Sequence, residues 1–205
     1  MEARRAQMVT EQLRPHGITD ERVLGVMGDL PREEFLNDPV RRFAYEDRAL
    51  AIGNGQTISQ PLVVAAMTQV LEPSPEQTAL EVGTGSGYQA AVLARLFKHV
   101  VTIERDPALG ERAAGVLRRL GFDNVEVVLG DGREGWPERA PYQAILIAAA
   151  ATDVPPALVE QLDEGGRLVM PLAFGAEDQE LRLLRKQGGR LTSRMLFPVR
   201  FVPLL

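Results

Sequence analysis

One short stretch, Leu80–Ala94, constrains the fold of this chain more than any other. It consists of an apolar run, three glycines at alternate positions (Gly83, Gly85 and Gly87) and a segment rich in alanine and leucine. The pattern predicts a strand, a tight loop and a helix, because glycine adopts positive φ and lets the backbone approach a ligand closely. The free N–H groups of the helix would point back at the loop. Such a unit predicts an α/β fold with a nucleotide or nucleoside site.

The spacing of the glycines separates the possible ligands. The dinucleotide fingerprint is G-x-G-x-x-G, whereas this chain has G-x-G-x-G, with Tyr88 where the last glycine would fall. This variant resembles the first motif of S-adenosyl-L-methionine (AdoMet) methyltransferases more than a nicotinamide site. A plain packing turn stays an alternative, since glycine loops join strand to helix in many α/β proteins.

Length and composition predict one domain. Of the 205 residues, 45% are hydrophobic and 25% are charged, which is ordinary globular composition. We expect residues 1–61 to form an N-terminal helical and substrate-loop region and residues 62–205 to form a Rossmann-like core.

Composition also argues against several partners. The net charge of -5 argues against a nucleic-acid surface. The chain has no cysteine and two histidines, so we expect no disulfide and no metal site. No apolar run is long enough for a membrane span, and the charged start is unlike a signal peptide. We therefore expect a cytoplasmic monomer that binds neither nucleic acid nor membrane.

Alternating apolar and helical patterns predict the rest of the fold. Strands are expected at 78–82, 99–104, 124–129, 142–148 and 167–172, and helices at 62–71, 88–94, 107–120 and 157–162, with a turn at 163–166. A closing hairpin is expected through Gly188-Gly189. The predicted class is α/β: a Rossmann-like, doubly wound, mostly parallel sheet with helices on both faces, a helical N-terminal region and a C-terminal antiparallel hairpin.

Three of the predicted strands end in residues suited to a nucleoside. Ligands of open α/β sheets bind beyond the carboxyl ends of the strands, which is where Gly83, Glu104 and Asp131 fall. Glu104 lies 21 residues after Gly83 and can accept hydrogen bonds from both ribose hydroxyls of AdoMet or NAD, although a solvated acid is the alternative. We expect Asp131 to accept from the adenine amine; turn chemistry alone would also explain Asp131-Gly132.

Residues 40–61 are irregular, polar and interrupted by glycines, and they lie directly before a predicted helix. A loop of this length is often functional. Thr57 and Ser59 would face the same side of an extended backbone. Ser59 also fits a position near the N-cap of the helix that Pro61 begins, and spacing alone favours this capping role over a catalytic one.

Several separated motifs run through nearly the whole chain. They are Gln7-Met8-Val9, Gln12-Leu13, Arg22-Val23-Leu24, Pro31-Arg32-Glu33, Ala44-Tyr45, Ile52–Pro61, Glu81–Ala94, Ile103-Glu104-Arg105, Gly130-Asp131-Gly132, Gly165–Val169 and Val199–Leu204. With these motifs in this order, the chain resembles members of the protein-L-isoaspartate(D-aspartate) O-methyltransferase family. It departs from the family at Ala51 and Thr152, where proline is usual, and at 38–42. A lost proline loosens a loop but removes no chemical group.

The resemblance implies a protein repair enzyme. Such an enzyme transfers a methyl group from AdoMet to the free α-carboxylate of L-isoaspartyl residues in damaged proteins and peptides, which gives S-adenosyl-L-homocysteine and a methyl ester. It implies that Ser59 is catalytic and that Gln56, Thr57 and Ile58 bind substrate. The implied cofactor-binding residues are Glu81, Gly83, Thr84, Gly85, Ser86, Gly87, Glu104, Arg105, Asp131 and Gly132.

Two rival functions remain open from the sequence. One is an AdoMet methyltransferase that acts on a small molecule or an RNA base. Such an enzyme would normally have a polar and aromatic motif after the fourth strand, where this chain has Ala148–Ala151. The other is a module that binds AdoMet without catalysis, or a nicotinamide protein.

Overall fold

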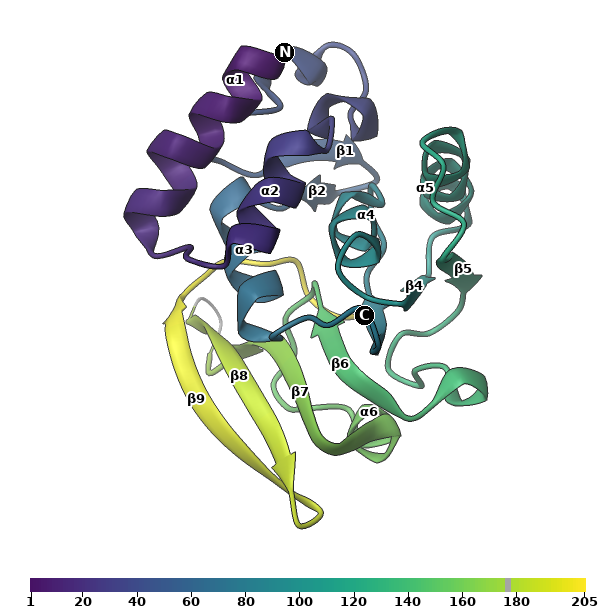
Figure 1. Ribbon diagram of the computed structural model, residues 1–205. Helices are drawn as coiled ribbons and strands as arrows, with labels where there is room; N and C mark the ends of the chain where they lie inside the picture. The colour runs from purple at the N-terminus through teal and green to yellow at the C-terminus, as the bar shows by residue number, and fades with distance from the viewer. Residues whose placement is uncertain (176–177) are drawn as a thin grey trace.

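Five parallel strands and an antiparallel hairpin form one seven-stranded sheet at the centre of the molecule (Figure 1). The structure is a computed structural model that describes residues 1–175 and 178–205. The strand order is β5-β4-β3-β6-β7-β8-β9, and β8 and β9 are antiparallel to their neighbours. The bounds are β3 (Thr78–Val82), β4 (His99–Glu104), β5 (Val125–Leu129), β6 (Tyr142–Ile147), β7 (Leu162–Ala173), β8 (Gln179–Gln187) and β9 (Arg190–Pro198). The predicted fold class and closing hairpin are confirmed.

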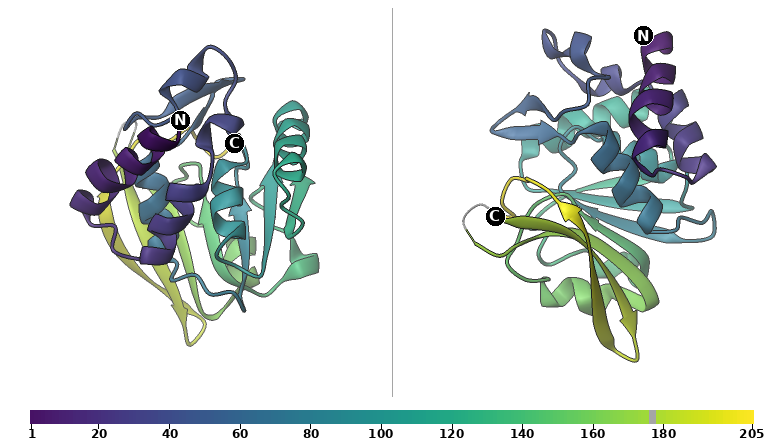
Figure 2. Two further views of the ribbon diagram at one scale, coloured as in Figure 1. Left: turned by 45° about the horizontal axis from the view of Figure 1, so that its top comes forward. Right: turned by 90° about the vertical axis from the view of Figure 1, so that its left-hand side faces the viewer.

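Both faces of the sheet are buried, because neighbouring residues on a strand enter different hydrophobic clusters. Val100 and Leu146 pack on one face and Val101 and Ile145 on the other. The first face carries α2 (Glu21–Asp29), α3 (Pro61–Val70), α4 (Tyr88–Ala94) and α5 (Pro107–Arg119); the second carries α6 (Pro156–Gln161) and the 3-10 turn Pro137–Arg139. Figure 2 shows how unequal the two helical layers are. Within residues 1–175 and 178–205, no helix has the length and apolar character needed to cross a membrane.

The N-terminal region packs on the first face and is helical, as predicted. Helix α1 (Glu2–Gln7) widens into a π-helix over Met8–Leu13 and tightens into a 3-10 turn over Arg14–His16. The N-cap of helix α2 is Asp20, whose side chain accepts a hydrogen bond from the Arg22 amide. Two 3-10 turns, Arg32–Phe35 and Val40–Phe43, then lead to the substrate-loop segment.

The reading of residues 40–61 as wholly irregular is wrong. Strands β1 (Leu50–Gly53) and β2 (Gln56–Ile58) pair antiparallel as a two-stranded hairpin. Asn54 and Gly55 form its turn, both with positive φ (52° and 71°). This Asn-Gly pair is the preferred chemistry for a two-residue hairpin loop. The Asn54 side chain donates a 2.6 Å hydrogen bond from Nδ2 to Oδ2 of Asp106, the N-cap of α5, and this bond connects the hairpin to that helix.

The prediction of a turn at 163–166 is also wrong. These residues lie inside β7, which runs without interruption from Leu162 to Ala173. Pairing with β6 skips from Tyr142↔Leu162 to Ala144↔Arg167, so the extra residues form a bulge. Gly165 has a φ of 78° within it, which explains why the sequence looks like a turn at this point.

Candidate functional site

A cavity of about 410 Å³ lies at the carboxyl ends of the central strands, beside β2. It brings together residues that are distant in the sequence: the segment after the hairpin and the ends of β3 and β4. Of the predicted site residues, the cavity is lined by Gln56, Thr57, Ile58, Ser59, Glu81, Gly83, Thr84, Gly85, Ser86, Glu104, Arg105 and Gly132. The other two predicted residues, Gly87 and Asp131, are not among its lining residues. The site therefore forms where a doubly wound sheet places its ligands.

The glycine loop has the conformation that its sequence predicts. Gly83, Gly85 and Gly87 have φ of 94°, 52° and 85°, a region that strains any residue with a Cβ. A Cβ on Gly87 would lie 3.2 Å from the Cβ of Ala113 in α5. Conformation and space both require glycine there, and the loop can approach a ligand by its backbone.

Glu104 ends β4 and holds the glycine loop. Its Oε2 accepts a 2.8 Å hydrogen bond from the Gly85 amide, and its Oε1 accepts one of 3.0 Å from the Asp106 amide. Each carboxylate oxygen has a second lone pair, so Glu104 can still accept from a diol. Over the described parts of the chain, no group of three or more acidic or histidine side chains could hold a metal ion.

Glu81 is a fully buried acid in the cavity wall. The Thr84 hydroxyl donates to Thr102 at 2.7 Å, because the Thr102 hydroxyl donates its own proton to Glu81 Oε2 at 2.5 Å. Burial raises the pKa of Glu81 to about 8; the Thr102 hydrogen bond opposes this rise and the Glu104 charge adds to it. Among the described residues, Glu81 Oε1 has no hydrogen-bond partner although it is buried. Such an atom is unusual in a folded protein and is free to accept from a ligand.

Ser59 lies between β2 and α3 and is half-buried at the cavity. The residue that caps α3 is Gln60, which makes no side-chain cap bond, and Pro61 follows at the first helical position. The capping role that spacing alone favoured for Ser59 is therefore wrong. Its hydroxyl makes no hydrogen bond to the residues that the structure describes, so it remains available.

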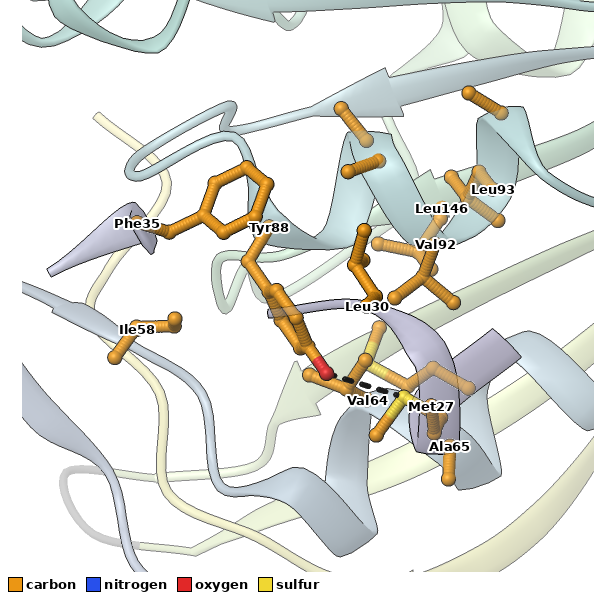
Figure 3. Packing of buried hydrophobic residues seen from close by; sticks show 14 of the residues in the cluster. Met27, Leu30, Phe35, Ile58, Val64, Ala65, Tyr88, Val92, Leu93 and Leu146 are labelled. Carbon is orange, nitrogen blue, oxygen red and sulfur yellow. Dashed lines mark hydrogen bonds between the residues drawn. The ribbon is translucent and has the colours of Figure 1, made fainter. Parts of the chain in front are cut away.

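The other predicted substrate residues lie on β2. Thr57 is exposed at the rim of the cavity, Gln56 is half-buried, and Ile58 is buried with its side chain toward the core (Figure 3). Ile58 thus supplies an apolar wall, while its neighbours present polar groups.

Asp131 and Gly132 follow β5 in a tight turn. Asp131 is exposed, and its Oδ1 accepts a 2.9 Å hydrogen bond from the Arg133 amide. Gly132 reaches the cavity, and a Cβ there would lie 2.3 Å from Val82 Cγ1. The Asp131 carboxylate therefore stabilises the turn through Oδ1, while its second oxygen, Oδ2, can accept from a ligand.

The end of the chain, for which no site role was predicted, belongs to the cavity as well. Residues 197–205 line the cavity, and this segment returns over the sheet after β9 (Figure 1). Leu204 donates to Ala150 O at 2.7 Å, and the Ala150 amide donates to Val202 O at 2.8 Å. The closing motif Val199–Leu204 was a signal for this role, since it is one of the motifs on which the resemblance rests.

Two solved structures share the whole fold. A protein-L-isoaspartate O-methyltransferase is 30% identical with a TM-score of 0.88, covering 99% of this chain and 65% of that one; this chain thus spans about two thirds of its length. A second, from Plasmodium falciparum, was solved in complex with S-adenosyl-L-homocysteine. It is 26% identical with a TM-score of 0.83 and covers 98% of both chains.

Sequence relatives agree with these structures. Protein-L-isoaspartate O-methyltransferase of Opitutus terrae is 51% identical over 97% of this chain and 85% of its own length. That of Gloeobacter violaceus is 47% identical over 96% of both chains. Residues 4–205 match the family model described as protein-L-isoaspartate(D-aspartate) O-methyltransferase. This chain therefore belongs to the protein-L-isoaspartate(D-aspartate) O-methyltransferase family.

Proposed function

We propose that the cavity is where this methyltransferase moves a methyl group from AdoMet to the free α-carboxylate of an L-isoaspartyl residue in a damaged protein or peptide. One observation carries the proposal: a single cavity joins the nucleoside-type ends of β3 and β4 to the half-buried, unpaired hydroxyl of Ser59. The products are a methyl ester and S-adenosyl-L-homocysteine.

The residues of the cavity suit AdoMet. The glycine loop offers close backbone approach, and Glu104 has free lone pairs for the ribose diol. Glu81 Oε1 is buried without a partner in the described structure. The ammonium of the methionine portion would favour the ionised form of Glu81, which can accept from it. We propose Arg105, Gly132 and Asp131 for the adenosine side, and Thr84 and Ser86 for the loop that surrounds it.

The proposed mechanism needs no general base. An α-carboxyl group has an intrinsic pKa of about 3.5, so it is ionised at neutral pH. AdoMet supplies the methyl group on a sulfonium, so the carbon–sulfur bond breaks as a carboxylate oxygen forms the carbon–oxygen bond. This fits a cavity without histidine, since His99 begins β4 at the opposite end of the strand.

The task of the protein is alignment. We propose that the Ser59 hydroxyl donates a hydrogen bond to the acceptor carboxylate and fixes its direction, with Gln56 and Thr57 shaping the entrance and Ile58 the apolar wall. Correct orientation alone can supply several kcal/mol of a barrier. The reacting charges neutralise each other, so a site that excludes water also favours the transition state.

The test has two stages. Calorimetry compares the binding of AdoMet with that of NAD, and only AdoMet should bind. Labelled methyl transfer then compares an isoaspartyl peptide with its aspartyl twin, and base-labile label should appear only on the first. Transfer to RNA or a small molecule instead, or AdoMet binding without any transfer, would overturn the proposal in favour of the rival functions.

We also propose that residues 1–61 and 62–205 act as one domain. Support comes from a continuous buried cluster that contains Met8 and Leu13 of the N-terminal region and Ala144 of the sheet. Cytoplasmic location, a monomeric state and the lack of nucleic-acid or membrane partners stay predictions from the composition.

A further inference from the structure

Arg32 is a fully buried arginine that contacts the substrate segment. It begins the 3-10 turn Arg32–Phe35 and has no exposed surface. Its Nη2 donates a 2.7 Å hydrogen bond to the main-chain carbonyl of Ser59, and its Nε donates one of 2.7 Å to the carbonyl of Ala44. One guanidinium thus joins both ends of the stretch that contains the β1–β2 hairpin.

The same guanidinium reaches the cofactor side of the cavity. Its Cζ lies 4.8 Å from the centroid of the Tyr88 ring, in a cation–π contact. Tyr88 is the first residue of α4, directly after the glycine loop, and Phe35 packs edge-on against it at 5.4 Å. Figure 3 shows Tyr88 between Phe35 and Met27, with Ile58 nearby on β2.

The positive charge of Arg32 is stabilised by uncharged groups. Within the described ranges, no carboxylate lies within ion-pair distance of it, so carbonyl oxygens and an aromatic face are its partners. Burial lowers the pKa of Arg32 to about 10, which leaves it protonated at neutral pH. At a buried position like this one, a well-packed apolar side chain usually gives a fold that is as stable as one with a buried charge. The planar fork of arginine, however, can point N–H groups at two separate carbonyls while it stacks on a ring.

We propose that Arg32 is a positioning residue, whose guanidinium fixes the Ser59 main chain against the helix that follows the glycine loop. The inference rests on the proposed role of Ser59. The Ser59 carbonyl and its hydroxyl belong to one residue, so a fixed carbonyl limits where the hydroxyl points. Misplacing a reacting group by about 1 Å can cost about a hundredfold in rate.

A double-mutant cycle tests this coupling. Arg32→Lys, Ser59→Ala and the double variant are compared with the wild type for kcat and KM on an isoaspartyl peptide and for AdoMet affinity by calorimetry. Arg32→Lys keeps a cation but loses the fork, and should lower kcat/KM about ten- to hundredfold with AdoMet affinity within about twofold. The double variant should be about as active as Ser59→Ala, because both changes remove the same contribution, the alignment of the acceptor by Ser59.

Controls separate positioning from stability. Lys186→Met removes another cation that donates to two carbonyls, Val159 and Leu162, far from the cavity, and should leave kcat and KM unchanged. Arg32→Gln is a second variant that keeps one donor without a buried charge. Multiplicative losses in the double variant, a tenfold loss of AdoMet affinity, or failure of both Arg32 variants to fold would overturn the inference. No methyl transfer by the wild type, or an unchanged Ser59→Ala, would instead refute the proposed function.

Discussion

Glu81→Gln should make the free protein more stable at neutral pH. Glu81 is fully buried, and its pKa is raised from 4.5 to about 8, so the folded state keeps a proton that the unfolded state has lost between those values. The stability that this proton provides is fully present below pH 4.5 and is lost as pH rises through 8, by about 1.4 kcal/mol per pH unit. At pH 7 the loss amounts to about 3 kcal/mol.

Glutamine has nearly the same shape and cannot ionise, so the variant should not show this slope. Urea unfolding of both proteins without AdoMet, at pH 5, 6, 7 and 8, measures the difference. The two proteins should differ by about 1 kcal/mol or less at pH 5, and the variant should be more stable by about 3 kcal/mol at pH 7. Parallel pH profiles would refute the reasoning, since other groups titrate equally in both proteins. AdoMet should bind the variant more weakly, because the amide cannot ionise beside the ammonium as the carboxyl group can.

Three further substitutions test the site. Glu104→Ala should weaken AdoMet binding about tenfold to a hundredfold, because a charge-assisted hydrogen bond is worth about 1.5–3 kcal/mol; unchanged calorimetric affinity would contradict the ribose assignment. Ser59→Ala should lower kcat/KM for an isoaspartyl peptide about ten- to hundredfold with AdoMet affinity nearly unchanged; equal losses would assign the serine to loop structure. Gly132→Ala should destabilise the fold by about 1–3 kcal/mol in urea unfolding, because its Cβ would lie 2.3 Å from Val82 Cγ1. Gly130→Ala is its matched control, since a Cβ there meets nothing within 4 Å; similar losses in both variants would contradict the packing argument.

The regular parts of the fold could be predicted because their patterns are local. Strand β3 lies at the predicted residues, and α5 begins at Pro107, as predicted. The β1–β2 hairpin was missed although Leu50 and Ile52 are buried and Ala51 and Gly53 exposed. Four residues are too few for periodicity to identify a strand, and the Asn-Gly turn was the stronger signal.

The candidate site could be predicted in part from the ends of the strands, whereas Ser59 and residues 56–58 came from the family resemblance. Glycine loop and Glu104 follow from topology, since parallel strands bring their carboxyl ends to one edge. The lining by residues 197–205 depends on contacts between distant segments, such as Leu204 with Ala150, which no local pattern contains. Arg32 belongs to a predicted motif, but a buried arginine and an exposed one look alike in sequence. Its partners are backbone carbonyls, which carry no sequence signature.

The most direct test of the account is a crystal structure of the complex with S-adenosyl-L-homocysteine and an isoaspartyl peptide. We predict that the product lies along the ends of β3 and β4, with its ribose hydroxyls on Glu104. The Ser59 hydroxyl should lie within hydrogen-bond distance of the peptide α-carboxylate, on the side of the sulfur. A peptide carboxylate bound elsewhere, or a Ser59 side chain turned away from it, would contradict the account.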